Sequence, residues 1–339
     1  MPASNHAMIA ENLTVGIPLY NSAEFIRESL ESIINQTVLP KKIIIIDDGS
    51  TDGGLTFVDD IIKRHDNIKV IKQSNMGLTK TLNKMLEICE TPYLVRQDAD
   101  DVSLPNRLAL TCNTIYTNPN AAVIYGEARY YANGMPGLRF RSTIGTPEVL
   151  KEITRQGKLL SICHPSTTLH IRHVRDVGGY RFGLHAEDVD LWWRLALKHP
   201  IAYNPNDFVM YRANSKSVSN SNIKSQLIST SYIQYLLLSE LLKLKPRDIE
   251  EIAAILQSII GKSYIEYRSK MKQANLYLDS GDRMAAAYAL LAAALARPID
   301  FAQRLTESRV NWHKSNKIHN SFPVEKFIQY SKELWGVEL

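Results

Sequence analysis

Four consecutive isoleucines, at positions 43–46, constrain the fold of this chain more than any other feature. A strand that is apolar on both faces must be covered on both faces, which is typical of a parallel sheet with helices on each side. Apolar runs alternate with amphipathic helical patterns through the first hundred residues, so we predict a doubly wound α/β sheet. Further strands are expected at 13–19, 67–73 and 93–95, and helices at 23–36 with Ser22 as cap, near 55–65, and from Gly77 to Cys89.

Polar clusters follow three of these strands. They are Pro18-Leu19-Tyr20-Asn21, Asp47-Asp48-Gly49-Ser50 and Asp98-Ala99-Asp100-Asp101. Ligands bind beyond the carboxyl ends of the strands in open parallel sheets, so the clusters predict one cleft with an aromatic ring and several carboxylates. Neither a GxGxxG nor a GxxxxGK[ST] loop is present, which disfavours a dinucleotide oxidoreductase or a P-loop NTPase.

Three carboxylates, those of Asp98, Asp100 and Asp101, fall in one turn and repel one another. A hard divalent cation such as Mg²⁺ or Mn²⁺ would compensate them, since it prefers oxygen ligands and takes one or two carboxylates together with substrate phosphates. The alternative is an acidic turn in contact with water, which is common in loops. Ser103 and Pro105 then predict the start of the next helix.

The middle of the chain is predicted to extend the sheet. Residues 121–131 indicate a pair of strands, followed by a turn at 133–137, and residues 161–170 indicate one more strand. A helix is expected to begin at Glu187-Asp188 and to end at Pro200. Acidic residues in a first helical turn often serve only to interact favourably with the helix dipole, and that alternative stays open here.

The composition changes near residue 215. A polar segment at 215–225 predicts a linker, and helical periodicity follows at 226–243, 247–275 and 283–296. We predict an α/β domain at 1–215 and a helical domain at 216–339. The latter contains one helix–turn–helix of tetratricopeptide type, with Gly281-Asp282 at the turn and Pro298 as the stop. Acceptor selection, dimerisation, contact with lipid head groups and packing alone are the roles open to it.

Charge and cysteine content limit the class of partner. The net charge is +5, without the concentrated basic stripe that indicates nucleic-acid binding. The cysteines, Cys89, Cys112 and Cys163, match neither a disulfide framework nor a zinc site, so a reducing compartment is expected. We recognise no secretory signal and no apolar run that could span a bilayer. The expectation is a cytoplasmic protein whose helical domain could touch the inner membrane peripherally.

Several ordered motifs between about residues 12 and 215 carry a family resemblance. They are IPLYN, IIIIDDGSTDG, QSNMGLTKTLNKML, RQDADD with a trailing PNRL, HPSTTLHIRHVRDVGGY and HAEDVDLWWRLA. With these motifs the chain resembles the GT-A glycosyltransferases of family 2, the large inverting group that builds bacterial polysaccharides. The resemblance implies a GT-A-like fold with a nucleotide-binding half at about 12–101 and an acceptor half at about 102–215.

The resemblance also implies which residues form the donor side. The turn after the first strand and the aspartate after the second would hold the nucleotide base and ribose, and the third loop would close over the nucleotide. Asp98-Ala99-Asp100 corresponds to the DXD element, in which Asp100 reaches a Mn²⁺ or Mg²⁺ ion and Asp98 holds the ribose or a metal-bound water. Asp101 is instead a candidate cap of the next helix. The nucleotide-sugar residues are thus Pro18, Tyr20, Asp48, Asn75, Gly77, Lys80 and Asp98.

On the acceptor side, Glu187-Asp188 occupies the place of the ED motif. The resemblance makes Asp188 the general base that takes the proton of the acceptor hydroxyl, while Glu187 orients the acceptor or the motif. Candidate acceptor contacts are His164, His185 and Trp192. Each has a structural alternative, since histidines also serve as structural hydrogen-bonding groups and tryptophans most often lie in the core.

The function implied is transfer of a hexosyl or N-acetylhexosaminyl group from a nucleotide diphosphate donor, with UDP as the expected nucleotide. The acceptor would be a hydroxyl of a glycan or of a lipid-linked oligosaccharide in bacterial surface polysaccharide synthesis. A sugar-nucleotide nucleotidyltransferase is one alternative, but its Gly-rich loop after the first strand is replaced here by IPLYNSAEF. A non-catalytic glycan-binding relative is the other alternative.

Overall fold

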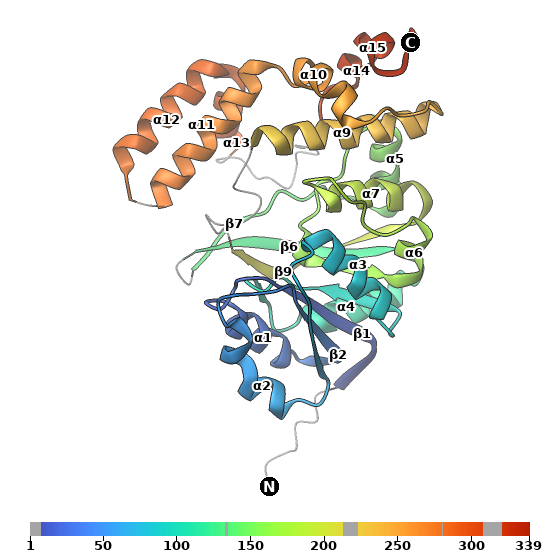
Figure 1. Ribbon diagram of the computed structural model, residues 1–339, viewed down its shortest axis with the longest axis vertical. Helices are drawn as coiled ribbons and strands as arrows, with labels where there is room; N and C mark the ends of the chain where they lie inside the picture. The colour runs from blue at the N-terminus through green and yellow to red at the C-terminus, as the bar shows by residue number, and fades with distance from the viewer. Residues whose placement is uncertain (1–7, 133–134, 213–222, 280, 308–320) are drawn as a thin grey trace. The chain divides into compact units, whose positions relative to one another are not determined.

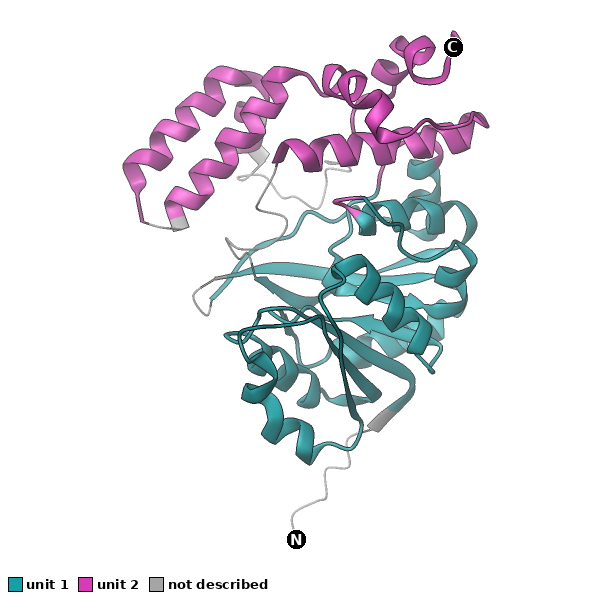
Figure 2. Ribbon diagram, in the orientation of Figure 1, with its two compact units in different colours: residues 1–154, 160–183, 187–213 teal, residues 155–159, 184–186, 214–339 magenta. Residues whose placement is uncertain are grey.

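The computed structural model describes residues 8–132, 135–212, 223–279, 281–307 and 321–339. The chain forms two compact units (Figure 2). Unit 1 consists of residues 1–154, 160–183 and 187–213, and unit 2 of residues 155–159, 184–186 and 214–339. Most of the polar linker predicted at 215–225 lies outside the described residues.

The described part of unit 1 contains one mixed sheet of nine strands (Figure 1). The strand order is β3-β2-β1-β4-β8-β6-β9-β5, and β7 pairs with β6. The first four strands in the chain are parallel to one another, as the prediction of alternating strands and helices requires, and β4 is antiparallel to β8 on its other side. The strands are β1 (Met8–Leu19), β2 (Val38–Asp47), β3 (Ile68–Lys72), β4 (Tyr93–Arg96), β5 (Val102–Ser103), β6 (Val123–Ala132), β7 (Met135–Arg139), β8 (Thr167–His170) and β9 (Ile201–Arg212).

The four isoleucines of β2 alternate between the two faces of this sheet. Ile43 and Ile45 lie in a core with Leu30 of α1, whereas Ile44 and Ile46 lie in a second core with Leu82 of α3. The prediction of a strand covered on both faces is therefore confirmed. The helices of unit 1 are α1 (Ile26–Ile34), α2 (Asp59–Arg64), α3 (Leu78–Ile88), α4 (Arg107–Thr117), α5 (Pro147–Arg155), α6 (Ile171–Asp176) and α7 (Glu187–Lys198), with 3₁₀ turns at Gly54–Val58 and His164–Ser166.

The local predictions for Ser22 and for residues 121–131 are wrong. The side chain of Ser22 does not cap α1, because its hydroxyl donates to the carbonyl of Tyr20 instead. Residues 121–131 do not form a strand pair. They belong mainly to the single strand β6, whose partners β8, β9 and β7 come from later in the chain. Local patterning does not reveal such distant pairing.

Unit 2 is helical throughout its described elements. Its core contains Tyr235, Leu238, Ile252 and Phe327. The helix predicted at 247–275 is two helices, because Gly261 adopts φ +84° between them, a conformation that glycine reaches at no steric cost. The helices are α9 (Ile223–Leu242), α10 (Ile249–Ile260), α11 (Lys262–Asp279), α12 (Arg283–Ala296), α13 (Pro298–Glu307), α14 (Val324–Gln329) and α15 (Ser331–Trp335). Within the described ranges, no helix has the length and apolar character needed to cross a bilayer.

Three histidines of unit 1 stack face to face. The ring of His173 lies 4.2 Å, centroid to centroid, from both His170 and His199. Asp176 binds the far side of the stack, at 3.0 Å from Nε2 of His199, and Tyr93 meets the ring of His170 edge-on. Burial, followed by the charges of His170 and His199, lowers the pKa of His173 from 6.5 to about 4.

We expect this stack to make the protein sensitive to mild acid. In the unfolded chain His173 is protonated below about pH 6.5, whereas in the folded chain it stays neutral down to about pH 4. The contribution of neutral His173 to the stability of the fold is therefore fully present above pH 6.5 and is lost as the pH falls from 6.5 to 4. With allowance for the partial exposure of His173, the free energy of unfolding should fall by about 1 kcal/mol between pH 7 and pH 5. Urea unfolding at both pH values measures it. A His173→Gln variant should lose correspondingly less, and equal losses would contradict the interpretation.

Candidate active site

The turns that follow β1 and β2 are hydrogen-bonded to each other. The backbone N–H of Asn21 donates to the hydroxyl of Ser50 (3.1 Å), and the backbone N–H of Thr51 donates to Oδ1 of Asn21 (2.8 Å). Pro18 pairs with Ile46 within the sheet, and the side chain of Tyr20 is half-exposed beyond its end. The first two polar clusters therefore meet at one edge of the sheet, as the sequence predicts.

Asp48 is buried and holds the loop at 73–77. Its Oδ1 accepts hydrogen bonds from Nε2 of Gln73 and from the backbone N–H of Met76, and its Oδ2 accepts one from the N–H of Gly77, all at 2.8 Å. A carboxylate offers about four acceptor sites, so the protein itself occupies most of them. The predicted contact of Asp48 with a nucleotide base stays a prediction. Asn75 and Lys80 are exposed on the same segment.

Replacing Asp48 by Asn should loosen this loop. An amide can accept on one side only, so its NH₂ group would face one of the three donors that Asp48 now binds. We expect a loss of about 1–3 kcal/mol in the free energy of unfolding, together with weaker nucleotide binding. Urea unfolding and titration with UDP measure the two effects. Asp52→Asn, in the neighbouring turn, is the matched control and should leave nucleotide binding unchanged.

The turn after β4 is built on a buried arginine. Arg96 is 1% exposed, and its Nη2 donates to Oδ1 of Asp98 at 2.5 Å. Its charge also acts on Asp100 and on the pair Glu187 and Asp188 at the start of α7. The aspartates that follow β4 and the acidic pair that opens α7 therefore share one cationic neighbour. Arg96 was not among the predicted site residues, although a charge that ends the buried run Tyr93–Val95 is a visible signal.

Asp100 and Asp101 lie between other charges. Burial and then the charge of Asp98 raise the pKa of Asp100 to about 6, and the same causes raise the pKa of Asp101 well above its ordinary value. Arg212, at the end of β9, donates its backbone N–H to Oδ1 of Asp101 (2.7 Å) and Nε to the carbonyl of Asp100 (2.8 Å). Its guanidinium also binds Glu28 at 2.5 Å.

The predicted helix start at Ser103 is wrong, and so is the capping role of Asp101. Ser103 belongs to β5, which pairs with Val209 of β9, and α4 begins only at Arg107. Asp101 does not cap α4, because the helix begins six residues later with Asn106 at its N-cap, and Oδ1 of Asp101 accepts from the backbone N–H of Arg212 instead. Arg107 is fully buried and donates to Ser103, to the side chain of Gln97 and to the carbonyl of Arg96, which fixes the turn from the side of α4.

A divalent cation fits the carboxylates of this turn. Within the described part of the chain, no group of three or more His, Cys, Asp or Glu side chains is arranged to hold a metal. A cation bound mainly by substrate phosphates needs only one or two carboxylates, however, and Asp98 and Asp100 supply two. The raised pKa of Asp100 shows that the site disfavours its own negative charge, which a cation would offset.

The carboxyl group of Asp188 has a pKa near neutral pH, which suits a general base. Burial and then the charge of Glu187 raise the pKa of Asp188 to about 7. The helix that carries both residues is anchored in the same first turn by Asp190, which is fully buried and binds Arg194 at 2.7 Å. Arg194 in turn donates to the carbonyls of Val177 (2.6 Å) and Gly179 (2.8 Å), so the start of α7 is held in place.

The predicted acceptor residues differ in position. Trp192 is fully buried, so the core alternative holds and it offers no exposed ring to a sugar. His164 is partly buried, its Nε2 lies 2.7 Å from the hydroxyl of Tyr180, and its ring meets Trp192 edge-on. Burial keeps the pKa of His164 well below its ordinary value, so the ring is neutral. His185 is exposed in the segment 184–186, and its role stays a prediction.

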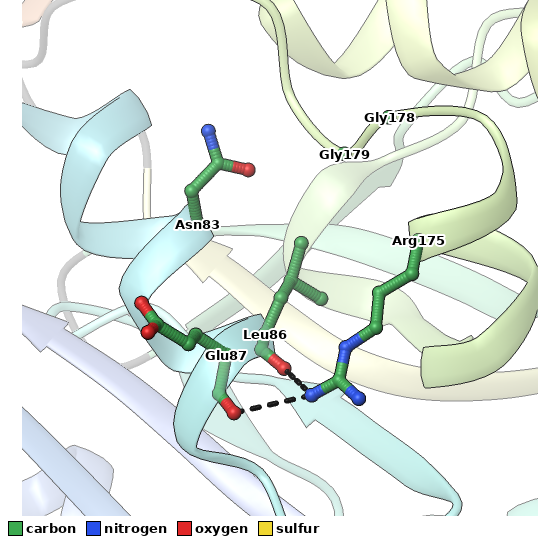
Figure 3. A pocket seen from close by; sticks show the side chains of 6 residues that line it. All are labelled: Asn83, Leu86, Glu87, Arg175, Gly178 and Gly179. Atoms are coloured by element: carbon green, nitrogen blue, oxygen red, sulfur yellow. Dashed lines mark hydrogen bonds between the residues drawn. The ribbon is translucent and has the colours of Figure 1, made fainter.

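An open pocket lies elsewhere in unit 1, between α3 and the segment 175–179 (Figure 3). Nη2 of Arg175 donates across it to the carbonyls of Leu86 (2.5 Å) and Glu87 (3.1 Å). Asn83, at the same pocket, holds Tyr180 by accepting from its backbone N–H and donating to its carbonyl. None of the predicted site residues lines this pocket. The hydrogen bonds of Arg175 and Asn83 join α3 to the segment that leads to Tyr180.

Comparison with known proteins decides the family. Residues 14–177 match the family model described as Glycosyl transferase family 2. The chain belongs to this family. The match favours the glycosyltransferase interpretation over a nucleotidyltransferase.

Two bacterial proteins are among the relatives of this chain. EpsE of Bacillus subtilis is 29% identical over 188 residues, which are 54% of this chain and 66% of EpsE. The Escherichia coli UDP-Gal:alpha-D-GlcNAc-diphosphoundecaprenol beta-1,3-galactosyltransferase is 28% identical over 189 residues, 53% of this chain and 66% of that enzyme. The matches thus span just under two thirds of these relatives.

A solved structure shares the fold. Residues 1–349 of TarS from S. aureus, in complex with UDP-GlcNAc, align with a TM-score of 0.56 at 19% identity, covering 85% of this chain and 92% of TarS 1–349. The predicted GT-A-like fold, with a helical C-terminal region, is confirmed.

Proposed function

We propose that this family 2 protein is an inverting glycosyltransferase that uses a nucleotide-diphosphate sugar, with UDP as the nucleotide. The observation that carries the proposal is that two acidic pairs from different elements both interact with the charge of Arg96. Asp98 and Asp100 follow β4, Glu187 and Asp188 open α7, and the charge of the same buried guanidinium acts on both groups. One group suits a donor diphosphate, and the other suits the proton of an acceptor.

In the proposed reaction, Asp188 takes the proton of the acceptor hydroxyl while its oxygen attacks the anomeric carbon from the side opposite the diphosphate. The bond from that carbon to the diphosphate oxygen breaks, and the nucleoside diphosphate departs with the bonding electrons. Asp98 and Asp100 would hold a Mn²⁺ or Mg²⁺ ion, which supplies charge stabilisation for the leaving diphosphate. The residues 12–101 would bind the donor, and the residues 102–215 would bind the acceptor.

The choice of UDP and of the acceptor rests on what similar proteins bind. TarS was solved with UDP and with UDP-GlcNAc, and the E. coli relative is named for transfer from UDP-Gal to a sugar on diphosphoundecaprenol. By analogy the acceptor here is a glycan or lipid-linked saccharide hydroxyl in bacterial polysaccharide synthesis. The cytoplasmic face of the inner membrane, with peripheral contact through unit 2, is the proposed location.

Isothermal titration of UDP into the protein, with Mn²⁺ and then with EDTA, tests the proposal. We expect binding heat with Mn²⁺ and its loss with EDTA. Binding of GDP or dTDP in place of UDP would overturn the choice of donor and keep the enzyme class. An absence of heat with all three nucleotides would overturn the proposed function.

A further inference from the structure

One face of α12 is apolar and exposed along its whole length. The chain has no charged residue between Arg283 and Arg297. In Figure 1 α12 lies beside α11, its extensive contact partner in unit 2, and the three alanines buried on α12 are Ala286, Ala289 and Ala293. The exposed face carries Met284, Tyr288, Leu291 and Leu295, which are 86, 74, 59 and 76% exposed. A helix that is apolar all round is ordinarily buried all round, so this face lacks a partner of its own size among the described residues.

The spacing of the four exposed side chains suits another helix. They are four, three and four residues apart, which is the spacing of a coiled-coil seam. This spacing reads the same in both directions along the helix. If two copies of α12 lie antiparallel, Met284 therefore comes opposite a leucine (position 295) and Tyr288 opposite another (position 291), at both ends of the pair. Small residues beside the seam, such as Ala287 and Ala292, allow the helix axes to approach closely.

We propose that the α12 face is a homodimer interface, formed by two copies of this chain packed antiparallel about a two-fold axis near residues 289–290. The exposed parts of the four side chains amount to about 600 Å² per copy, or about 1,200 Å² for the pair, which reaches the lower limit for specific interfaces. A two-fold pair is self-complementary, so the single apolar face of each copy covers that of the other.

A lipid surface fits this face less well than a second copy. Helices that lie on membranes carry Lys and Arg along a solvent-facing side, which attract anionic head groups. The side of α12 away from the exposed stripe contains buried alanines, and its residues 284–296 include no cation. A charge-free seam instead places nothing repulsive between two copies of the same helix.

Sedimentation velocity of the full chain, at about 1 to 100 µM, tests the interface. We expect the dimer fraction to rise with concentration and Leu291→Glu to abolish it without changing the circular dichroism spectrum. Leu138→Glu, a leucine of β7 that is 76% exposed, is the matched control and should still dimerise. A wild-type monomer at every concentration, or an unaffected Leu291→Glu dimer, would overturn the proposal. So would cosedimentation of a monomeric chain with phosphatidylglycerol vesicles that Leu291→Glu abolishes.

Disulfide trapping tests the antiparallel register. Antiparallel packing separates the two Met284 positions but brings each beside residue 295 of the other copy. A mixture of the single variants Met284→Cys and Leu295→Cys should therefore form a mixed disulfide dimer under mild oxidation, whereas neither variant alone should. The wild-type chain, with Cys89, Cys112 and Cys163, is the control for background trapping. Efficient trapping by Met284→Cys alone would indicate a parallel pair and overturn the antiparallel arrangement.

Discussion

Replacing Asp188 by Asn should lower kcat by about 10²- to 10⁴-fold, the usual contribution of a general base, and leave the affinity for UDP nearly unchanged. The amide keeps the size of the carboxylate but cannot take the proton of the acceptor hydroxyl. Burial and Glu187 raise the pKa of Asp188 to about 7, so the wild-type rate should fall as the pH drops below 7, where the base becomes protonated. Rate measurements from pH 5 to 9 would show this limb, and the variant should lack it.

Glu187→Gln is the matched variant for this experiment. It removes the neighbouring charge that helps raise the pKa of Asp188, so the acidic limb of the rate profile should move to lower pH while most of the rate is kept. Full activity of Asp188→Asn would show that another group is the base. A parallel loss of UDP affinity would show that Asp188 acts on the donor.

Asp100→Asn should abolish the metal dependence of donor binding and lower kcat/KM by at least about 10²-fold, since several kcal/mol of charge stabilisation are lost. The same variant should be more stable than the wild type at pH 8, by about 2 kcal/mol. The reason is that burial and Asp98 raise the pKa of Asp100 from 3.8 to about 6, so its ionised form opposes folding. Titration with UDP and Mn²⁺, together with thermal unfolding, measures both effects.

Asp101→Asn is the control that distinguishes loss of a metal ligand from the mere removal of one negative charge in this turn. Its Oδ1 can still accept the hydrogen bond from the backbone of Arg212, and one negative charge is again removed. We therefore expect higher stability with donor binding retained. If Asp101→Asn and Asp100→Asn weaken UDP binding equally, then Asp100 has no special role toward a cation.

Local patterning predicts the first half of the fold because strands and helices alternate there, and the pairs β1–β2 and β2–β3 are each separated by helical segments alone; only β4 returns from further along the chain to pair with β1. The alternation of β2 between two cores follows directly from four isoleucines in a row. The second half depends on distant pairing. β5 exists because Val102 and Ser103 meet Met210 and Val209 of β9, more than a hundred residues later, and no local pattern contains that information.

The candidate site is predictable in its acidic residues and not in its basic ones. Runs of aspartate after strands are visible in sequence, whereas the arginines that fix them are scattered along the chain. Arg96 ends β4, Arg107 begins α4 and Arg212 ends β9. Arg96 lies beside the aspartates in the sequence, but Arg107 and Arg212 are recognised only when the fold brings them to the turn at 96–101. A buried arginine of this kind needs several acceptors at once, and these come from different elements.

The three hydrogen bonds to Asp48 have a kinetic consequence. These bonds already order the loop at 73–77 in the free protein, so binding of a nucleotide does not have to order that segment. In the proposed donor site, the entropic cost of association is then small for this loop, and UDP should bind rapidly. A variant that frees the loop, such as Asp48→Asn, should therefore slow the association of UDP as well as weaken its binding.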